Sequence, residues 1–317
     1  MLGFLSSLGE QVVDAEEESF LLFTRDIPSA NLGFVDARAS VVDVTLHGQE
    51  LAIHQSPTLL SSRREGGTTG AVLWKITPRF AEWIAAPKNP FFAASILTPS
   101  ATVVELGCGI SGLVALALAP RVGHFIATDQ EYVRKLFKQN IDENVHQQQQ
   151  QQPKKRKPKV GNSSSSSSSS DNITFTPLDW EVDNPSTLKQ TISSTNTTTT
   201  GDQPDPGFDL LISCDCIYNE ALVPAFVRTC ADICRLRPTY QPNTIPDEDD
   251  DQSGSAERPT VCVIAQQQRS PDVFETWLRE TLRVFDVWRL SDHVLGEVLK
   301  DGTGYIVHAL ALKASSH

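Results

Sequence analysis

The chain has 317 residues, of which 39% are hydrophobic, and carries a formal net charge of -12. That length is enough to bury one good-sized core or two smaller ones. The acidic balance argues against nucleic-acid binding through a broadly basic surface and suits a basic protein partner. Residues 113–119 form the longest apolar stretch and end at Pro120, far short of the roughly 20 residues that cross a membrane.

The residues near the start predict an extension without a targeting role. The segment "MLGFLSSLGEQVVDAEEESF" lacks basic residues and turns acidic by Glu16, so we expect neither a secretory nor a mitochondrial signal. Apolar residues then alternate on both sides of His47-Gly48, which predicts a β-hairpin over residues 42–54. We therefore place an N-terminal extension with a hairpin at residues 1–60.

From residue 61 onward, short β-branched runs alternate with helical patterns. This alternation predicts an α/β fold with a mainly parallel sheet and helices on both faces. The expected strands are at residues 102–106, 124–128, 173–177, 208–214, 260–265, 284–290 and 305–312, and the expected helices are at 113–119, 132–144, 222–236 and 271–282.

Three low-complexity segments interrupt this pattern, at about residues 147–170, 185–206 and 239–258. They are rich in Gln, Ser, Thr, Pro or Asp and hold too few apolar residues to offset their ordering entropy, so we expect them to lie outside the core. The first contains the basic cluster Lys154–Lys157. A solvated insert is the favoured interpretation of this cluster, and a nuclear-import signal or an RNA contact is the alternative.

The six cysteines are expected to be reduced, because several lie within apolar strand-like or helix-like segments. Cys230 and Cys234 lie four residues apart on an expected helix, but no second Cys/His pair with zinc spacing answers them. We therefore expect no metal site.

The stretch "VVELGCGISG" over residues 103–112 contains G-x-G-x-x-G after an apolar run. Such glycines permit a tight turn beside any nucleotide-like ligand, a dinucleotide included. Asp129 ends the next strand, where a carboxylate can accept both ribose hydroxyls or, alternatively, cap the following helix. Glu105 discriminates between the two candidate ligands. A carboxylate before the loop would repel the pyrophosphate of a dinucleotide but would attract the cationic S-adenosylmethionine. The motif therefore favours a methyl-donor loop over an NAD loop.

Five segments in this order resemble the seven-strand lysine methyltransferases of methyltransferase family 16: "GAVLWKITPRFAEWI", "VVELGCGISG", "ATDQ", "LDW" and "LLISCDCIYNEAL". The resemblance implies a Rossmann-like sheet whose last strand is antiparallel, in a methyltransferase domain over residues 61–317. It further implies protein-lysine N-methylation with S-adenosylmethionine, on a ribosomal large-subunit or other translation-related protein. The residues that it implies for the cofactor are Trp74, Gly107, Cys108, Gly109, Asp129, Trp180 and Cys214, to which we add Glu105.

The resemblance also places Asp215 and Tyr218, in a D-x-x-Y pattern, beside the methyl-transfer channel. Asp215 would orient the incoming amine and Tyr218 would form the channel wall; a helix cap and simple packing are the structural alternatives. Arg269 either closes over the site or is a plain surface arginine.

Other functions remain open at this stage. One is a cofactor-binding scaffold without turnover. The other is methylation of RNA or a small molecule, although the N-P-P-Y pattern of amino-methyltransferases that act on nucleic acids is replaced here by Ser213-Cys214-Asp215-Cys216. We expect a cytoplasmic monomer with a protein substrate and without direct nucleic-acid or membrane binding, and nuclear import stays an alternative.

Overall fold

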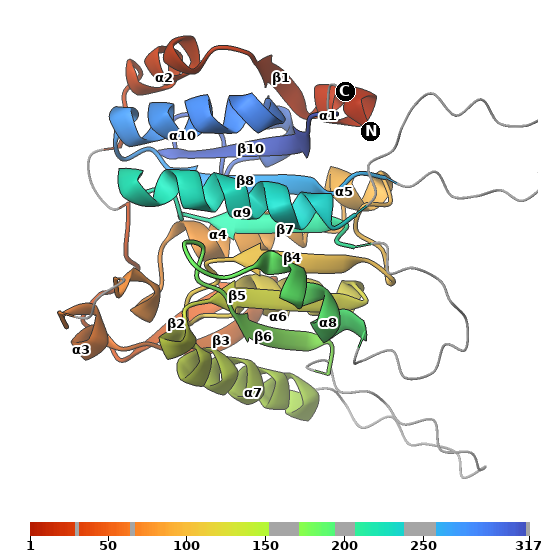
Figure 1. Ribbon diagram of the computed structural model, residues 1–317. Helices are drawn as coiled ribbons and strands as arrows, with labels where there is room; N and C mark the ends of the chain where they lie inside the picture. Colours follow the sequence, from red (N-terminus) through yellow and green to blue (C-terminus); the bar gives the residue numbers. More distant parts are fainter. Residues whose placement is uncertain (29–31, 64–66, 152–170, 194–206, 238–257, 315–317) are drawn as a thin grey trace, which may run out of the picture.

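The computed structural model describes residues 1–28, 32–63, 67–151, 171–193, 207–237 and 258–314. An eight-stranded sheet runs through it in the order β1-β9-β10-β8-β7-β4-β5-β6. Its strands are β1 (Gly9–Val12), β4 (Thr102–Leu106), β5 (His124–Asp129), β6 (Ile173–Pro177), β7 (Leu210–Cys214), β8 (Val261–Gln267), β9 (Phe285–Leu290) and β10 (Tyr305–Leu312). Figure 1 views this sheet with its strands stacked from β10 down to β6.

The central strands β6, β5, β4, β7 and β8 are parallel, and β10 is antiparallel to both β8 and β9. The predicted α/β class and the antiparallel last strand are therefore confirmed. The central strands β4 and β7 are buried at every position, as expected of parallel strands covered on both faces.

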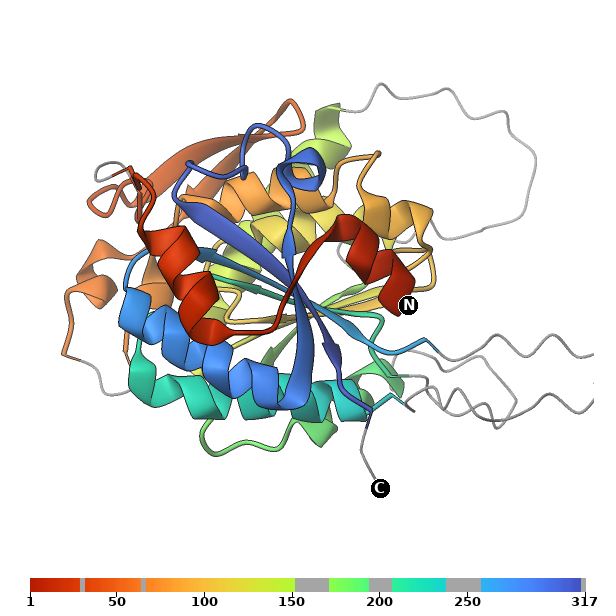
Figure 2. The same cartoon turned by 90° about the horizontal axis from the view of Figure 1, so that it is seen from above.

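Helices cover both faces of the sheet, as Figure 2 shows from above. One apolar cluster joins the sheet to α1 (Leu2–Leu8), α4 (Ile76–Ile84), α6 (Leu113–Leu118) and α7 (Arg134–Gln151). The opposite cluster joins it to α2 (Ala15–Phe23), α8 (Leu188–Ser193), α9 (Val223–Arg235) and α10 (Pro271–Val284). Short helical turns complete the described chain: α3 (Pro57–Leu60), η1 (Thr69–Ala71), α5 (Pro90–Ala93), η2 (Ala119–Arg121), η3 (Glu131–Val133), η4 (Pro185–Thr187), η5 (Glu220–Leu222) and α11 (Asp292–Leu295).

The predicted hairpin is confirmed as β2 (Val41–Leu46) and β3 (Gln49–His54), which form a separate two-stranded sheet. His47 and Gly48 both have positive φ, at 49° and 77°, which is the backbone of a two-residue hairpin turn. Burial alternates strictly along β2, so one face of the hairpin packs on the domain.

The first 23 residues contribute to the main sheet, which the sequence pattern did not predict. β1 pairs antiparallel with β9, with Gly9 opposite Leu290. A Cβ on Gly9 would meet the Arg289 carbonyl oxygen at 1.8 Å, so the close approach of the two strands there requires glycine.

The expected boundary of the second insert is wrong at its start. η4 and α8 occupy residues 185–193, and Leu188 is fully buried in the cluster around α9. One buried leucine anchors this turn although its neighbours are polar. Residues 194–206, the basic cluster Lys154–Lys157 and residues 239–257 lie outside the described residues. No helix among the described residues is long and apolar enough to cross a membrane.

Candidate active site

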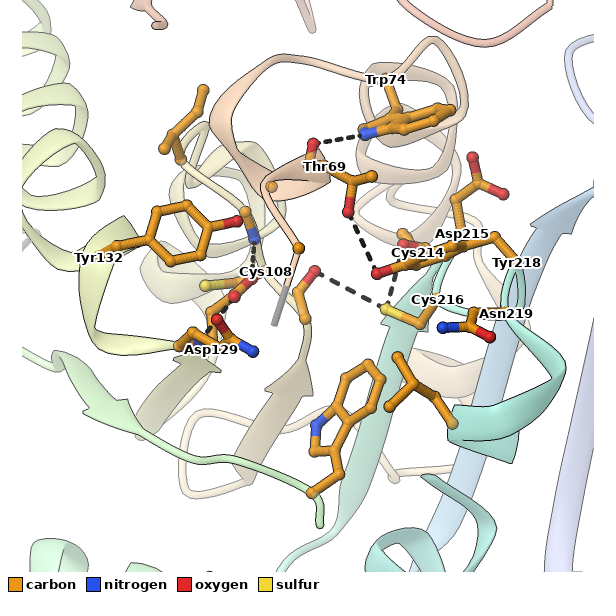
Figure 3. A pocket seen from close by; sticks show the side chains of 18 of the residues that line it. Thr69, Trp74, Cys108, Asp129, Tyr132, Cys214, Asp215, Cys216, Tyr218 and Asn219 are labelled. Carbon is orange, nitrogen blue, oxygen red and sulfur yellow. Dashed lines mark hydrogen bonds between the residues drawn. The ribbon is translucent and has the colours of Figure 1, made fainter. Parts of the chain in front are cut away.

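A cavity of about 430 Å³ opens at the carboxyl ends of β4, β5 and β7. This is the edge where open parallel sheets bind ligands, and the volume falls within the usual range for small-molecule pockets. Five segments line it: residues 67–77 above, 107–111 from the glycine loop, 129–132 at the end of β5, 178–181 after β6 and 214–222 after β7. Figure 3 shows the side chains that converge there.

The glycine loop is built on left-handed backbone. Gly107 and Gly109 have φ of 67° and 59°, a conformation that L side chains rarely adopt. A Cβ on Gly107 would lie 2.3 Å from the Cys216 sulfur, so a larger residue does not fit. The Cys108 N–H donates to the Thr128 carbonyl, which holds the loop against the end of β5.

Asp129 faces this loop from the end of β5 (Figure 3). One carboxylate oxygen accepts the Gly109 N–H at 2.8 Å and the other accepts the Gln130 N–H at 2.7 Å. Burial raises the pKa of Asp129 to about 6, and the two N–H donors act in the opposite direction. The 3₁₀ turn that follows begins after Gln130, so Asp129 orders the glycine loop and does not cap the next helix.

Glu105 lies on β4 with 1% of its surface exposed, and it is absent from the cavity lining. Burial, followed by the nearby Asp129 charge, raises its pKa to about 8. Its carboxyl therefore favours the neutral form in the ligand-free protein and does not line the cavity, so a negative loop entrance stays a prediction for the bound cofactor. One of its oxygens is buried without a hydrogen-bond partner among the described residues.

Asp215 follows β7 in a left-handed conformation, with φ of 56°. Its carboxylate accepts the Gln267 N–H at 3.2 Å and pairs with the Arg269 guanidinium at 2.7 Å. The helix-cap alternative is wrong, because Asn219 caps η5 by accepting the Ala221 N–H. Arg269 is exposed at the surface, as one alternative expected, but its guanidinium pairs with Asp215 and lies over the Trp74 ring.

Tyr218 connects the floor of the cavity to its roof. Its hydroxyl accepts a hydrogen bond of 3.2 Å from the Thr69 hydroxyl, and the Thr69 carbonyl accepts the Trp74 ring N–H at 3.0 Å (Figure 3). Burial raises the pKa of Tyr218. Tyr218 is therefore a neutral wall residue at physiological pH.

Trp180 enters the cavity from the segment after β6. Its ring packs edge-on against Phe226, and its indole nitrogen is buried without a partner among the described residues. Arg228 fixes the backbone by donating to the Trp180 carbonyl at 2.7 Å. A flat ring beside the glycine loop can stack on a planar base.

The cavity gathers every expected site residue except Glu105, namely Trp74, Gly107, Cys108, Gly109, Asp129, Trp180, Cys214, Asp215 and Tyr218. Sequence reasoning missed the roof residues Thr69 and Gly70 and the wall residues Tyr132 and Asn219, although the run "GGTTG" before Trp74 was a signal for a close backbone approach. Among the described residues, no cluster of three or more His, Cys, Asp or Glu could hold a metal ion.

The chain is similar to lysine methyltransferases. Residues 53–157 match the family model described as "Lysine methyltransferase". Ribosomal lysine N-methyltransferase 5 of Zygosaccharomyces rouxii is 27% identical over 72% of this chain and 69% of its own length, and that of Vanderwaltozyma polyspora is 25% identical over 93% and 97%. The family resemblance predicted from the motifs is thereby confirmed.

Another relative has a different name. A protein of Schizosaccharomyces pombe, diaminohydroxyphosphoribosylamino-pyrimidine deaminase, is 34% identical over 42% of this chain, but the match spans only 32% of that protein. Among solved structures, the methyltransferase domain of bacterial CtHen1 covers 70% of this chain and 94% of its own, with 13% identity and a TM-score of 0.39.

Proposed function

Because residues 53–157 match the lysine methyltransferase family, we propose that the chain is an S-adenosylmethionine-dependent protein-lysine N-methyltransferase. The observation that carries this proposal is the single cavity that joins the glycine loop and Asp129 to Asp215 and Tyr218. The substrate proposed is a protein of the large ribosomal subunit or another translation-related protein, and the names of the fungal relatives support this choice. The proposed place of action is the cytoplasm, and the proposed form is a monomer.

The residues around the glycine loop fit the methyl donor. Asp129 keeps lone pairs for ribose hydroxyls beyond its two backbone donors, and Trp180 offers a ring face beside Gly107. One oxygen of the buried Glu105 carboxyl, two residues before Gly107, lacks a hydrogen-bond partner among the described residues, and a nearby cation would favour the ionised form of this carboxyl. When bound, S-adenosylmethionine supplies an electrophilic methyl group, whose carbon bonds to the lysine nitrogen while the carbon–sulfur bond breaks with its electron pair left on sulfur.

The chain's own residues then have to place a neutral amine. Lysine has an ordinary pKa of about 10.4, so the amine must lose its proton to solvent before it can attack. Burial in the cavity favours the neutral amine. Tyr218, held by Thr69, walls the approach, and Asp215 at the end of β7 orients the amine; both act by positioning.

The test is methyl transfer to large ribosomal subunits from a Saccharomyces cerevisiae strain that lacks its own ribosomal lysine N-methyltransferase 5. The purified protein with radiolabelled S-adenosylmethionine should label one subunit protein, and acid hydrolysis should release methyl-lysine. Label in ribosomal RNA would replace the proposal with RNA methylation. If the protein binds the cofactor but labels no subunit or lysate fraction, it is a cofactor-binding scaffold without turnover.

A matched pair of variants links this activity to the cavity. Asp129→Ala should weaken S-adenosylmethionine binding by about 1–3 kcal/mol, the cost of lost hydrogen bonds to a charged group, and should abolish labelling at low cofactor concentration. Asp43→Ala, which removes an exposed carboxylate on β2, is the control.

Calorimetric titration should also detect no NAD binding, and saturable NAD binding without a response to S-adenosylmethionine would contradict the proposal.

A further inference from the structure

The carboxylate of Asp215 is already occupied by protein groups. Its side chain is 3% exposed, and both oxygens accept hydrogen bonds, from the Gln267 N–H and from the Arg269 guanidinium. Its own N–H donates to Ala265, so the residue is tied to β8 on both sides. An incoming ammonium would have to compete with Arg269 for the same carboxylate.

Arg269 itself is held in three directions. The same Nη2 that pairs with Asp215 lies 2.9 Å from the Gln267 side-chain oxygen. The guanidinium carbon lies 4.9 Å from the centre of the Trp74 ring, a cation–π distance. Trp74 in turn packs on Phe34, with ring centres 4.3 Å apart. Arg269 therefore links the ends of β7 and β8 to the roof of the cavity.

We infer that Arg269 is a positioning residue that pairs with Asp215, so that the wall beside the incoming lysine carries no net charge and favours the neutral amine. This inference rests on the proposed function. An unpaired Asp215 carboxylate would hold the lysine as an unreactive ammonium, whereas the ion pair orients the amine without stabilising its charge. The pair also avoids the cost of leaving one buried charge alone.

Among the residues that the structure describes, few other ionisable groups lie near this pair. Tyr218 and Tyr305 are neutral because burial raises the pKa of each, and the Arg79 guanidinium lies over the Tyr305 ring at 5.5 Å. The pKa values of the cysteine thiols on either side of Asp215 are also raised by burial, so both thiols stay protonated. Asp129, whose pKa is raised to about 6 by burial, lines the same cavity, and Glu105, whose pKa is raised to about 8 by burial, lies near Cys214.

Removing one charge of the pair should shift the pH dependence of methylation, and the shift for Arg269 should be opposite to that for Asp215. Arg269→Gln leaves an unpaired carboxylate, so the pH of half-maximal kcat/KM should rise by at least half a unit while KM at pH 7 falls. Asp215→Asn leaves an unpaired guanidinium, so the same pH should fall and KM should rise. Asparagine tolerates the left-handed backbone at this position, which keeps that variant folded. The acceptor is the large ribosomal subunit described above.

The double variant Asp215→Asn with Arg269→Gln decides between two roles of the pair. If the two charges compensate each other, the pH of half-maximal kcat/KM in the double variant should return close to that of the unmodified protein. If Asp215 instead bound the ammonium directly, the double variant would show the full loss of Asp215→Asn with no recovery. That result, or unchanged profiles in both single variants, would overturn the inference.

A control comes from the opposite end of β7. Arg237 pairs with Asp209 at the same distance of 2.7 Å, and its side chain is 9% exposed against 28% for Arg269. Arg237→Gln should lower the melting temperature without moving the pH profile, so a general loss of stability is distinguishable from loss of compensation. Arg269→Lys keeps the charge and should show less than half of the shift seen for Arg269→Gln.

A second measurement needs no methyl transfer. With S-adenosylhomocysteine present, n-butylammonium should bind Arg269→Gln at least threefold more tightly than the unmodified protein at pH 7, and the double variant should lose that gain. If the unmodified protein methylates no lysine but this gain is seen, the proposed function fails, and only the charge compensation between Asp215 and Arg269 is supported. If methylation is seen but n-butylammonium binds all variants equally, the inference fails alone.

Discussion

The Asn140 side chain forms the same two hydrogen bonds with the His54 backbone that a neighbouring strand would form. Its carboxamide oxygen accepts the His54 N–H at 2.8 Å, and its amide donates to the His54 carbonyl at 2.9 Å and to the Ile110 carbonyl at 2.7 Å. Asn144, one turn further along α7, repeats the pattern with Ala52. Two buried asparagines of a helix thus satisfy one edge of β3 and tie the hairpin to the glycine loop.

Asn140→Ala should lower the free energy of unfolding by about 2–3 kcal/mol, because it leaves buried backbone groups of β3 and the loop without partners. Lys138→Ala, on the same helix and exposed, is the control and should change it by less than about 0.5 kcal/mol. Denaturation by urea measures both. An equal effect of the two substitutions would mean that loss of helix packing, and not of these hydrogen bonds, sets the stability.

The core strands were predictable because each is a short apolar run between turn residues, and β4, β6 and β10 have the predicted bounds. β1 was not predictable, since "GEQV" has one inward-facing apolar residue and owes its pairing to β9. The cavity residues were predictable because the ends of parallel strands meet at one edge. The pairing of Asp215 with Arg269 was not, because 54 residues separate them and nothing in either local sequence indicates the other.

Leu188 shows that amino-acid composition alone does not predict which residues are buried. It begins α8 and is fully buried in the cluster around α9, within a stretch that its Ser, Thr and Pro content assigns to an insert. Leu188→Ala should cost about 2–4 kcal/mol of unfolding free energy, as for other buried leucines. Gln190→Ala, two residues away and exposed, should cost almost nothing. If urea denaturation shows a negligible change in unfolding free energy for both variants, residues 185–193 belong to the insert and not to the core.

Glu105 should make the ligand-free protein less stable as pH rises. Its folded pKa of about 8 lies above the usual 4.5, so the folded chain keeps a proton that the unfolded chain has lost between these values. The unfolding free energy therefore falls as pH rises through that window. Asp129 contributes a similar fall only up to about pH 6, its own folded pKa.

The range from pH 6 to 8 isolates Glu105. At about 1.4 kcal/mol per pH unit, its carboxyl should account for a fall of about 2 kcal/mol there, and Glu105→Gln should remove that fall. Denaturant titrations at pH 6, 7 and 8 measure it, with Glu50→Gln on the exposed face of the hairpin as the control. A parallel decline in both variants would place the titrating group elsewhere.

The Tyr218 hydroxyl should contribute to methyl transfer through its hydrogen bond with Thr69. Tyr218→Phe keeps the ring that walls the cavity but removes the acceptor of the 3.2 Å hydrogen bond that joins the loop after β7 to the roof. If that bond holds the roof closed, Tyr218→Phe and Thr69→Val should each reduce kcat/KM about three- to tenfold, up to about 1.4 kcal/mol, and the double variant should lose no more than either one. Methyl transfer to large ribosomal subunits measures this cycle, with the thermal stability of each variant as a check on folding. A much larger loss for Tyr218→Phe than for Thr69→Val would show that the hydroxyl acts directly on the amine, because Thr69→Val leaves that hydroxyl in the cavity.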